Sequence, residues 1–342
     1  MREILGRWLS LLLSIAVLGG VSFLVQDNLD PYYFTILIGC GIYAILAVSL
    51  NLINGITGQF SIGHAGFYGV GAYMGAAWTM IWQPTLVKSM PFLQTGSLAG
   101  NSLNLVITLV LAALGAAFAG WLVGLPSLRL RGDYLAIVTL GFGEVIRIFL
   151  LNIEVLGGAS GLSSIPTLAK QHNTAVFWVF GVLILSILFS RNLMQSVQGL
   201  KWMAVREDEI AADAMGVNTT KVKVTSFVIG AAFAGMAGTL FAHFYTGISP
   251  DNFDMNISIL ITTMVVLGGT GSVTGSVVAA FLLTAAPEFL RIDWFKDYRM
   301  TIYSTLLVVL MLTRPQGIFG HKELSLRRLI PFRKRRREEK SI

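Results

Sequence analysis

The sequence predicts an all-α integral membrane protein, a polytopic bundle of about ten transmembrane spans with both termini in the cytoplasm. Of its 342 residues, 54% are hydrophobic and only 13% are charged, whereas a soluble domain carries about a quarter charged residues. The mean hydropathy of +0.71 points the same way. This composition excludes a soluble enzyme, a disordered protein and a nucleic-acid-binding module with a solvated surface.

Apolar runs of near-bilayer length divide the chain into ten predicted spans. They lie at residues 9–25, 32–53, 60–82, 103–125, 135–151, 174–190, 225–245, 257–267, 271–290 and 300–313. The first run is long for the apolar core of a secretory signal, and no clear A-x-A cleavage site follows it, so we expect an uncleaved span. The span at 257–267 is short, and the glycine-rich break after it is expected at membrane depth.

The placement of basic residues predicts the orientation. With the N-terminus inside, nineteen of the 25 Lys and Arg residues fall in cytoplasmic segments and five in outer segments, the bias that cytoplasmic loops show. Ten of them lie at or beyond Arg314, five of these in the run at 333–337. Such a run is typical of contact with anionic membrane lipid, and no nucleic-acid partner is expected. Residues 1–313 are therefore expected to form a transmembrane domain with a cytoplasmic loop at 191–224, and residues 314–342 a basic cytoplasmic tail.

Cysteine and histidine are scarce. The single cysteine, Cys40, excludes an intramolecular disulfide and a cysteine-based metal cluster. The four histidines are scattered, with no H-x-x-x-H pair. We predict no metal site and no catalytic residue on this chain.

The loop at 191–224 is the largest polar segment between spans, and it carries small apolar residues beside its charges. In a helix within 199–218, Ile210, Ala214 and Val217 share one face, and Gly216 suits a C-terminal cap. This pattern favours a docking element, with a solvated connector helix on the membrane surface as the alternative. The candidate docking residues are Arg206, Glu207, Asp208, Glu209, Ala211, Ala212 and Gly216.

Two glycine-rich stretches, 58–76 and 268–276, interrupt apolar segments. A broken helix is tolerated in lipid only where the freed backbone lines a cavity or is buried in protein. The functional interpretation is a lining for a polar solute, and the alternative is tight helix packing with a cytoplasmic turn. The two breaks occupy corresponding places in two five-span halves, as in transporters with an internal duplication. The candidate path residues are Gly58, Gln59, Ser61, Gly63, His64, Glu144, Arg147, Gly268, Gly269, Gly271 and Ser272.

Glu144 and Arg147 are spaced i, i+3 on one face of the fifth predicted span. Each charge alone would cost about 2.5–3.5 kcal/mol at mid-membrane, so a pair that faces the bundle is expected. We favour a structural ion pair. A proton relay or a contact with a zwitterionic solute is the alternative. For His64, a hydrogen-bonded packing role is likewise favoured over a role in the path.

Five stretches in order along the chain carry motifs. They are GQFSIGHAGFYGVGAYMGA (58–76), LRGDYLAIVTLGFGEVIR (130–147), REDEIAADAMGVNTTKVK (206–223), VVLGGTGSVTGSVVAA (265–280) and RPQGIFG (314–320). Together they resemble the LivM-type permeases of ATP-binding-cassette importers for branched-chain amino acids. Within them, residues 209–216 resemble the A-A-x-x-x-G core by which such permeases engage their ATPases. This chain departs from that core by inserting Ile210 and by lacking its I-x-L-P ending.

The resemblance implies a transmembrane permease subunit of an importer for branched-chain or related amino acids, multi-pass in the bacterial inner membrane. It also implies four partners besides lipid: a second, LivH-type permease, two cytoplasmic ATPases and an extracytoplasmic solute-binding protein. No cofactor is expected on this chain. The dipeptide Gly-Lys never occurs, so the chain has no G-x-x-x-x-G-K-[ST] phosphate loop, and ATP and Mg would be bound by the ATPases. The alternatives are a proton-coupled secondary transporter, a passive channel, and a permease of the same class for urea, amides, sugars or other small solutes.

Overall fold

The computed structural model describes residues 30–87, 98–127, 132–167, 172–291, 298–314 and 316–320. The predicted first span (9–25) and almost all of the predicted tail (314–342) lie outside the described residues. The described chain is helical apart from turns and one pair of two-residue strands, which confirms the predicted fold class.

The elements follow one another along the chain with short connections. They are α2 (Pro31–Asn51), η1 (Leu52–Ile56), α3 (His64–Ala77), η2 (Trp78–Trp82), α4 (Gln83–Val87), α5 (Leu98–Ser127), α6 (Asp133–Asn152), η4 (Glu154–Leu156), η5 (Gly158–Ser160), β1 (Leu162–Ser163), α7 (His172–Met194), α8 (Val197–Glu207), α9 (Glu209–Ala214), α10 (Thr219–Tyr245), β2 (Gly247–Ile248), η6 (Pro250–Phe253), α11 (Met255–Gly268), α12 (Val273–Phe289) and α13 (Arg299–Thr313). The segments η1 and η2 are π-helical and continue α2 and α3, whereas η4, η5 and η6 are 3-10 turns.

Five helices of the described chain are long and apolar enough to cross a bilayer: Pro31–Ile56, Gly100–Pro126, Asp133–Asn152, Thr174–Met194 and Thr219–Tyr245. Each coincides with a predicted span. The apolar helix α12 is shorter, and α11 has 14 residues, which agrees with the short span expected there. The count of ten spans and the side on which each terminus lies stay predictions.

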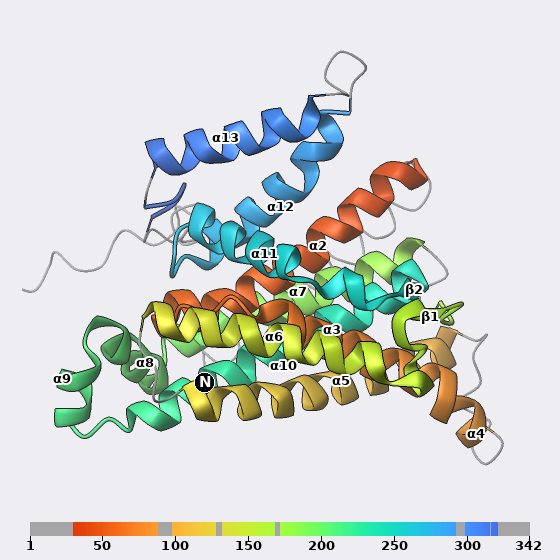
Figure 1. Ribbon diagram of the computed structural model, residues 1–342, viewed down its shortest axis with the longest axis horizontal. Helices are drawn as coiled ribbons and strands as arrows, with labels where there is room; N and C mark the ends of the chain where they lie inside the picture. The colour runs from red at the N-terminus through yellow and green to blue at the C-terminus, as the bar shows by residue number, and fades with distance from the viewer. Residues whose placement is uncertain are drawn as a thin grey trace, which may run out of the picture.

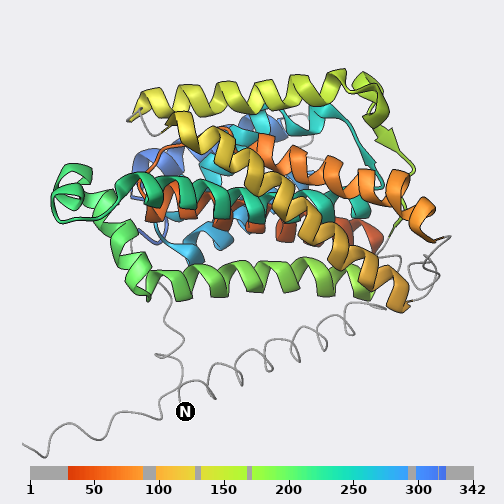
Figure 2. The same cartoon turned by 90° about the horizontal axis from the view of Figure 1, so that it is seen from below.

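The helices run roughly along one axis, with α8 and α9 projecting from one end and the strand pair β1–β2 at the other (Figure 1). We call these the loop end and the strand end. The strands are antiparallel, with Leu162 opposite Ile248. The first described helix, α2, lies inside the bundle and packs against α12, α10 and α7. Seen from below, α7 and α6 lie on opposite sides of the bundle (Figure 2).

Glycine lets α3 and α10 pack with their backbones in contact. A Cβ placed on Gly71 would lie 2.1 Å from the carbonyl oxygen of Gly235, and one on Gly238 would lie 2.1 Å from that of Tyr68. Such distances are far below van der Waals contact, so both positions need glycine. Small residues allow the same close approach in membrane helices generally. For the part of the 58–76 stretch within α3, the observed arrangement is therefore tight helix packing.

Candidate functional site

The two glycine-rich breaks meet at the loop end of the bundle. The backbone N–H of Gly271 donates a hydrogen bond to the Asn51 side chain at 2.8 Å. A Cβ on Gly271 would lie 3.4 Å from the carbonyl oxygen of Gly55. The end of α2 and the η1 segment, directly before the first break, thus lie against the break between α11 and α12, more than 200 residues away in sequence.

The described part of the motif at 314–320 covers the second break. The backbone N–H of Ile318 donates to the carbonyl of Leu267 at 2.8 Å, and that of Phe319 donates to the carbonyl of Gly268 at 3.3 Å. Gly269 ends α11 with a backbone φ of +106°, a value that residues with a side chain rarely adopt. Ser272 then caps α12 by accepting a hydrogen bond from the Gly275 N–H at 3.1 Å. Four predicted path residues, Gly268, Gly269, Gly271 and Ser272, therefore build a closed turn.

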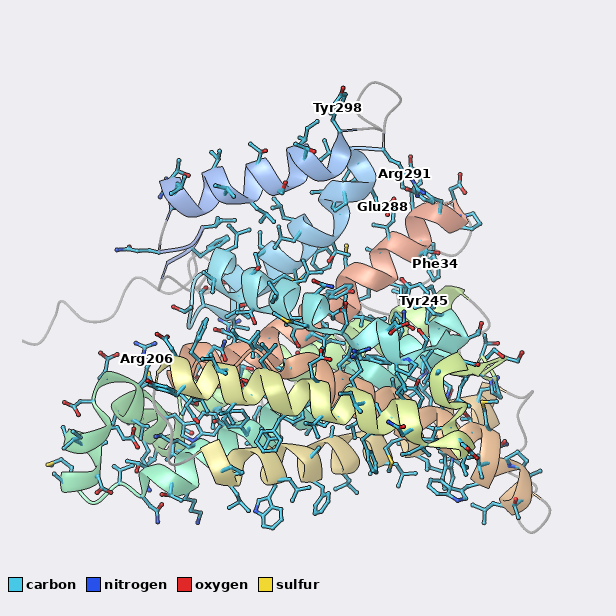
Figure 3. The ribbon with its side chains drawn as sticks, viewed as in Figure 1. Phe34, Arg206, Tyr245, Glu288, Arg291 and Tyr298 are labelled. Carbon is cyan, nitrogen blue, oxygen red and sulfur yellow. The ribbon has the colours of Figure 1, made fainter. Side chains whose placement is uncertain are left out.

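Arg206 joins this site to the loop. Its Nη1 donates to the carbonyl oxygen of Gly55 at 3.2 Å, and its Nη2 donates to Glu207 at 2.7 Å. A Cβ on Gly58 would lie 2.6 Å from Cγ of Arg206, and one on Gly271 would lie 3.0 Å from its Nη1. Arg206 lies at the junction of the loop and the bundle (Figure 3). A predicted docking residue and two predicted path residues thus share one set of contacts, a link that the sequence analysis did not foresee.

The loop itself differs from the single docking helix expected within 199–218. It folds as α8 and α9, separated at Asp208. The Asp208 carboxylate accepts hydrogen bonds from the N–H groups of Ile210 at 2.8 Å and Ala211 at 3.0 Å, so it caps a new helix instead of continuing the first. The predicted cap at Gly216 is confirmed, because its φ is +82° and the Val217 N–H donates back to the carbonyl of Ala212.

The outer surface of the loop is partly apolar. Ile210 is 67% exposed and Met215 is 84% exposed, and Ala214 beside them is also exposed. In contrast, Ala212 is buried in a small cluster that joins the loop to the bundle. That cluster comprises Leu52, Ile56, Trp202, Val205, Ala212, Val222 and Phe233. Of the predicted docking residues, Ala212 therefore packs inward.

An ion pair also ties α9 to α10. Lys223, only 5% exposed, donates to the Glu209 carboxylate. Burial of the ammonium requires such a partner, since an unpaired buried charge is strongly unfavourable. The loop is thus fixed to the bundle by Glu209 and Arg206 through polar contacts and by Ala212 through apolar ones.

The polar residues of the first break are buried, and each makes at least one hydrogen bond to protein, while Gln59 Oε1, Ser61 Oγ and His64 Nδ1 have no partner within the described structure. His64 shares a 2.7 Å hydrogen bond between its Nε2 and the Ser49 hydroxyl, and Gln59 donates to Ser226 at 2.9 Å. The Ser61 backbone pairs with the Asn54 side chain through two hydrogen bonds of 3.1 Å. A Cβ on Gly63 would lie 1.9 Å from the carbonyl of Thr139, so α6 closes this side. These contacts are those of packing residues, and a role in the path stays a prediction.

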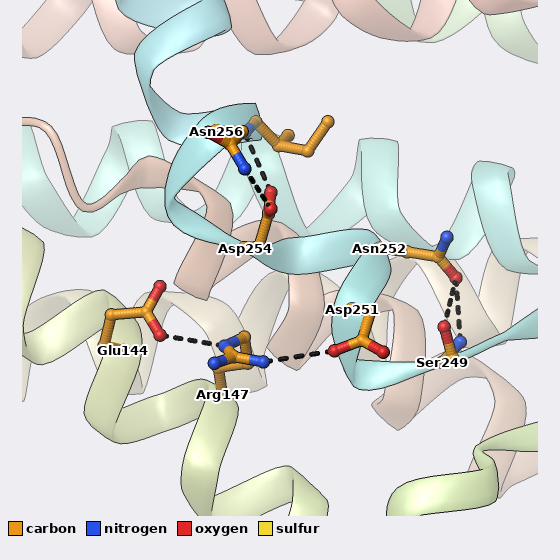
Figure 4. Close-up of polar contacts among 8 residues, drawn as sticks. Glu144, Arg147, Ser249, Asp251, Asn252, Asp254 and Asn256 are labelled. Atoms are coloured by element: carbon orange, nitrogen blue, oxygen red, sulfur yellow. Dashed lines mark hydrogen bonds and ion pairs between the residues drawn. The ribbon is translucent and has the colours of Figure 1, made fainter.

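Glu144 and Arg147 form the expected pair, at 2.8 Å between Oε2 and Nε. Arg147 Nη1 also reaches the Asp251 carboxylate at 3.2 Å, which links α6 to η6 (Figure 4). Asp251 was not among the predicted site residues, although Asp251 and Asp254, shortly after the α10 span, were a visible signal. Within the described ranges, no three His, Cys, Asp or Glu residues are grouped as metal ligands.

The helical bundle with its apolar spans and glycine-rich breaks defines a multi-pass membrane protein. The family model described as "Branched-chain amino acid transport system / permease component" matches residues 32–312, so the chain belongs to that family and is a transport permease component.

Relatives agree with this assignment. The chain is 38% identical over 307 residues to the high-affinity branched-chain amino acid transport system permease protein LivM of Salmonella typhimurium and equally to that of Escherichia coli. Each alignment covers 81% of this chain and 67% of the relative. The LivH permease protein of Escherichia coli is 27% identical over 298 residues, which covers 82% of this chain and 92% of LivH. No solved structure matches significantly.

Proposed function

We propose that this chain is one of two permease subunits in an ATP-binding-cassette importer of the bacterial inner membrane, and that the importer carries branched-chain amino acids. The names of the LivM and LivH relatives support this substrate class, and identity is higher to LivM than to LivH. The second permease is then LivH-type. Two cytoplasmic ATPases bind ATP and Mg, and a solute-binding protein delivers the amino acid from outside.

The single observation that carries the mechanism is the bridge from Arg206 to the first break. The loop presents an exposed apolar surface around Ile210 and Met215, and Arg206 at the end of α8 contacts Gly55, Gly58 and Gly271. A movement imposed on α8 and α9 by an ATPase would therefore be passed directly to the two breaks. The breaks are the places where helix packing can change with the least loss of regular hydrogen bonding.

The ion network of Glu144, Arg147 and Asp251 is consistent with ATP as the energy source. All three side chains are partly or largely exposed and paired. Pairing of both acids with Arg147 fits the structural ion pair favoured from the sequence, and the proposal gives these residues no part in proton transfer.

The docking surface is tested by co-purification. The chain is co-expressed with a LivH-type permease and both ATPases, and the ATPase recovered per permease is measured. We expect the double substitution Ile210→Glu and Met215→Glu to lower this ratio about tenfold, because buried apolar contacts dominate interfaces. The control is Val155→Glu, an equally exposed apolar position at the strand end. An unchanged ratio in the double variant would contradict docking at this surface.

A further inference from the structure

A cavity of about 490 Å³ lies near the strand end, away from Arg206. Residues of α2, α3, α10, η6 and α11 line it, so it lies where the η6–α11 turn meets the bundle and is partly open to the surface at the exposed Asp251, Asn252 and Asn256. Its volume falls within the range of about 300–1,000 Å³ that small-molecule sites occupy.

The walls of the cavity differ in chemistry. Ile42, Ile257 and Phe241 provide apolar surface, and the Phe241 ring packs on that of Tyr245 with centroids 4.7 Å apart. The polar wall comes from the η6–α11 turn, where Asp251, Asn252, Asp254 and Asn256 line the cavity. The Asp251 carboxylate is directed at Arg147 (Figure 4). None of the described residues that line the cavity is basic.

Asp254 forms no direct ion pair within the described part of the chain, although Arg147 lies close enough to attract it electrostatically. Asp254 accepts the Ile257 N–H at 3.1 Å as the cap of α11 and the Asn256 amide at 2.6 Å. Asp251, in contrast, shares Arg147 with Glu144. Since the three acids Glu144, Asp251 and Asp254 share the single positive charge of Arg147, the wall at Asp254 keeps a net negative charge that favours a positively charged group.

The Tyr68 hydroxyl gives a second indication of a ligand in the cavity, independent of the charge of Asp254. Tyr68 is 1% exposed, and its hydroxyl lacks a hydrogen-bond partner within the described structure, yet it lines the cavity. Its ring is held in place by Phe253 and Phe241, with centroids at 5.0 Å and 5.5 Å. A buried polar group is normally hydrogen-bonded, and an unsatisfied one needs an explanation. A solute in the cavity that accepts a hydrogen bond from the Tyr68 hydroxyl would satisfy this group.

We propose that this cavity binds a small zwitterionic amino acid with an apolar side chain, with its ammonium group on Asp254 and its carboxylate accepting from Tyr68. The aliphatic side chain then contacts Ile42 and Phe241. This inference rests on the proposed function, because it places a solute site within the permease itself. An anionic solute without an ammonium group is disfavoured by Asp254, and a plain amine leaves the Tyr68 hydroxyl unsatisfied.

The test uses the complete importer complex in proteoliposomes, with ATP enclosed, the solute-binding protein outside and radiolabelled L-leucine as the probe. Tyr68→Phe removes one hydroxyl, and we expect uptake to fall about 3- to 10-fold, as for loss of one hydrogen bond. Asp254→Asn keeps a good helix cap but removes the charge, and we expect a loss of about tenfold or more.

The matched control is Tyr73→Phe. Tyr73 lies on the same helix, is equally buried, contacts the same Phe253 ring and also has an unpaired hydroxyl, but it does not line the cavity. We expect its uptake to equal that of the wild type. Melting temperatures and ATPase recovery for all three variants show whether each complex is intact.

A second measurement separates the ligand groups. Leucine binding to the detergent-purified complex without the solute-binding protein is measured by equilibrium dialysis, with 3-methylbutylamine and 4-methylpentanoate as probes that each lack one charged group. We expect saturable leucine binding, at least tenfold tighter than that of either probe, and its loss in Asp254→Asn. If the wild-type complex imports leucine but does not bind it here, or if both cavity variants import at the wild-type rate, the inference is wrong while the proposed function stands. If the wild-type complex shows no ATP-driven leucine uptake, the proposed function itself fails.

Discussion

Arg206 donates a hydrogen bond from Nη1 to the backbone carbonyl of Gly55, at 3.2 Å, across 151 positions of sequence. The same guanidinium holds Glu207 through Nε and Nη2. Because Gly55 lies in the π-helical end of α2, this one side chain connects the cytoplasm-facing loop of the proposed mechanism to a helix inside the bundle. With the apolar packing of Trp202 and Val205 near Leu52 and Ile56, this contact gives a movement of α8 a direct path to the core.

Arg206→Lys is expected to uncouple ATP hydrolysis from transport. Lysine keeps the charge but cannot hold a carboxylate and a carbonyl with one planar fork. We expect the complex to assemble and hydrolyse ATP while leucine uptake falls by about tenfold, as for a lost charge-assisted hydrogen bond. The control, Lys201→Ala, removes an exposed cation from the same helix. Equal losses of assembly and uptake, or no loss at all, would refute coupling through Arg206.

The close contact of α3 with α10 predicts a strong effect of one added methyl group. Gly71→Ala places a carbon about 2 Å from the Gly235 backbone, so the helices must separate. We expect destabilisation by about 1–3 kcal/mol, visible as a lower melting temperature of the purified protein. Gly181→Ala is the control, since that Cβ meets nothing within 4 Å in α7. Equal melting temperatures for the two variants would show that the contact does not constrain the fold.

The Glu209–Lys223 pair predicts a rescue experiment. Glu209→Gln leaves the buried Lys223 ammonium without its carboxylate, at an expected cost of about 1–3 kcal/mol. Adding Lys223→Met removes the charge, and we expect the double variant to recover most of the stability. Limited proteolysis of the 191–224 loop measures both steps. If Glu209→Gln is cleaved at the wild-type rate, the ion pair does not hold the loop.

Glu144→Gln is expected to leave ATP-driven uptake within about twofold of the wild type, because partly exposed ion pairs contribute about 0–1 kcal/mol. Arg147 keeps Asp251 as a partner in this variant. Uptake is compared with and without an imposed proton gradient. A gradient-dependent uptake that disappears in Glu144→Gln would favour the secondary-transporter alternative.

Local features of the fold were predictable from the sequence. The short α11 followed from the length of its apolar run, the cap at Gly216 from its place after small residues, and the Glu144–Arg147 pair from i, i+3 spacing. Each depends on residues that are neighbours in sequence. The break at Asp208 was missed, because a single helix satisfies the same apolar spacing and only the side-chain cap distinguishes the two.

Long-range features were not predictable in the same way. Nothing in the 191–224 segment indicates that Arg206 reaches Gly55, and the cavity at Tyr68 and Asp254 is assembled from segments that are far apart in sequence. Ala212 matched a docking motif, yet it is buried, since which face of a short helix packs inward is decided by the bundle that receives it. Tertiary contacts, rather than local pattern, determine these sites.

The most direct test of the account is leucine accumulation in proteoliposomes that contain this chain with its LivH-type partner and both ATPases. The vesicles enclose ATP and have the solute-binding protein outside, and they are compared with vesicles that lack ATP but carry a proton gradient. The account predicts accumulation with ATP alone and none with the gradient alone. Accumulation driven by the gradient in vesicles that contain only this chain would contradict an ATP-driven permease subunit.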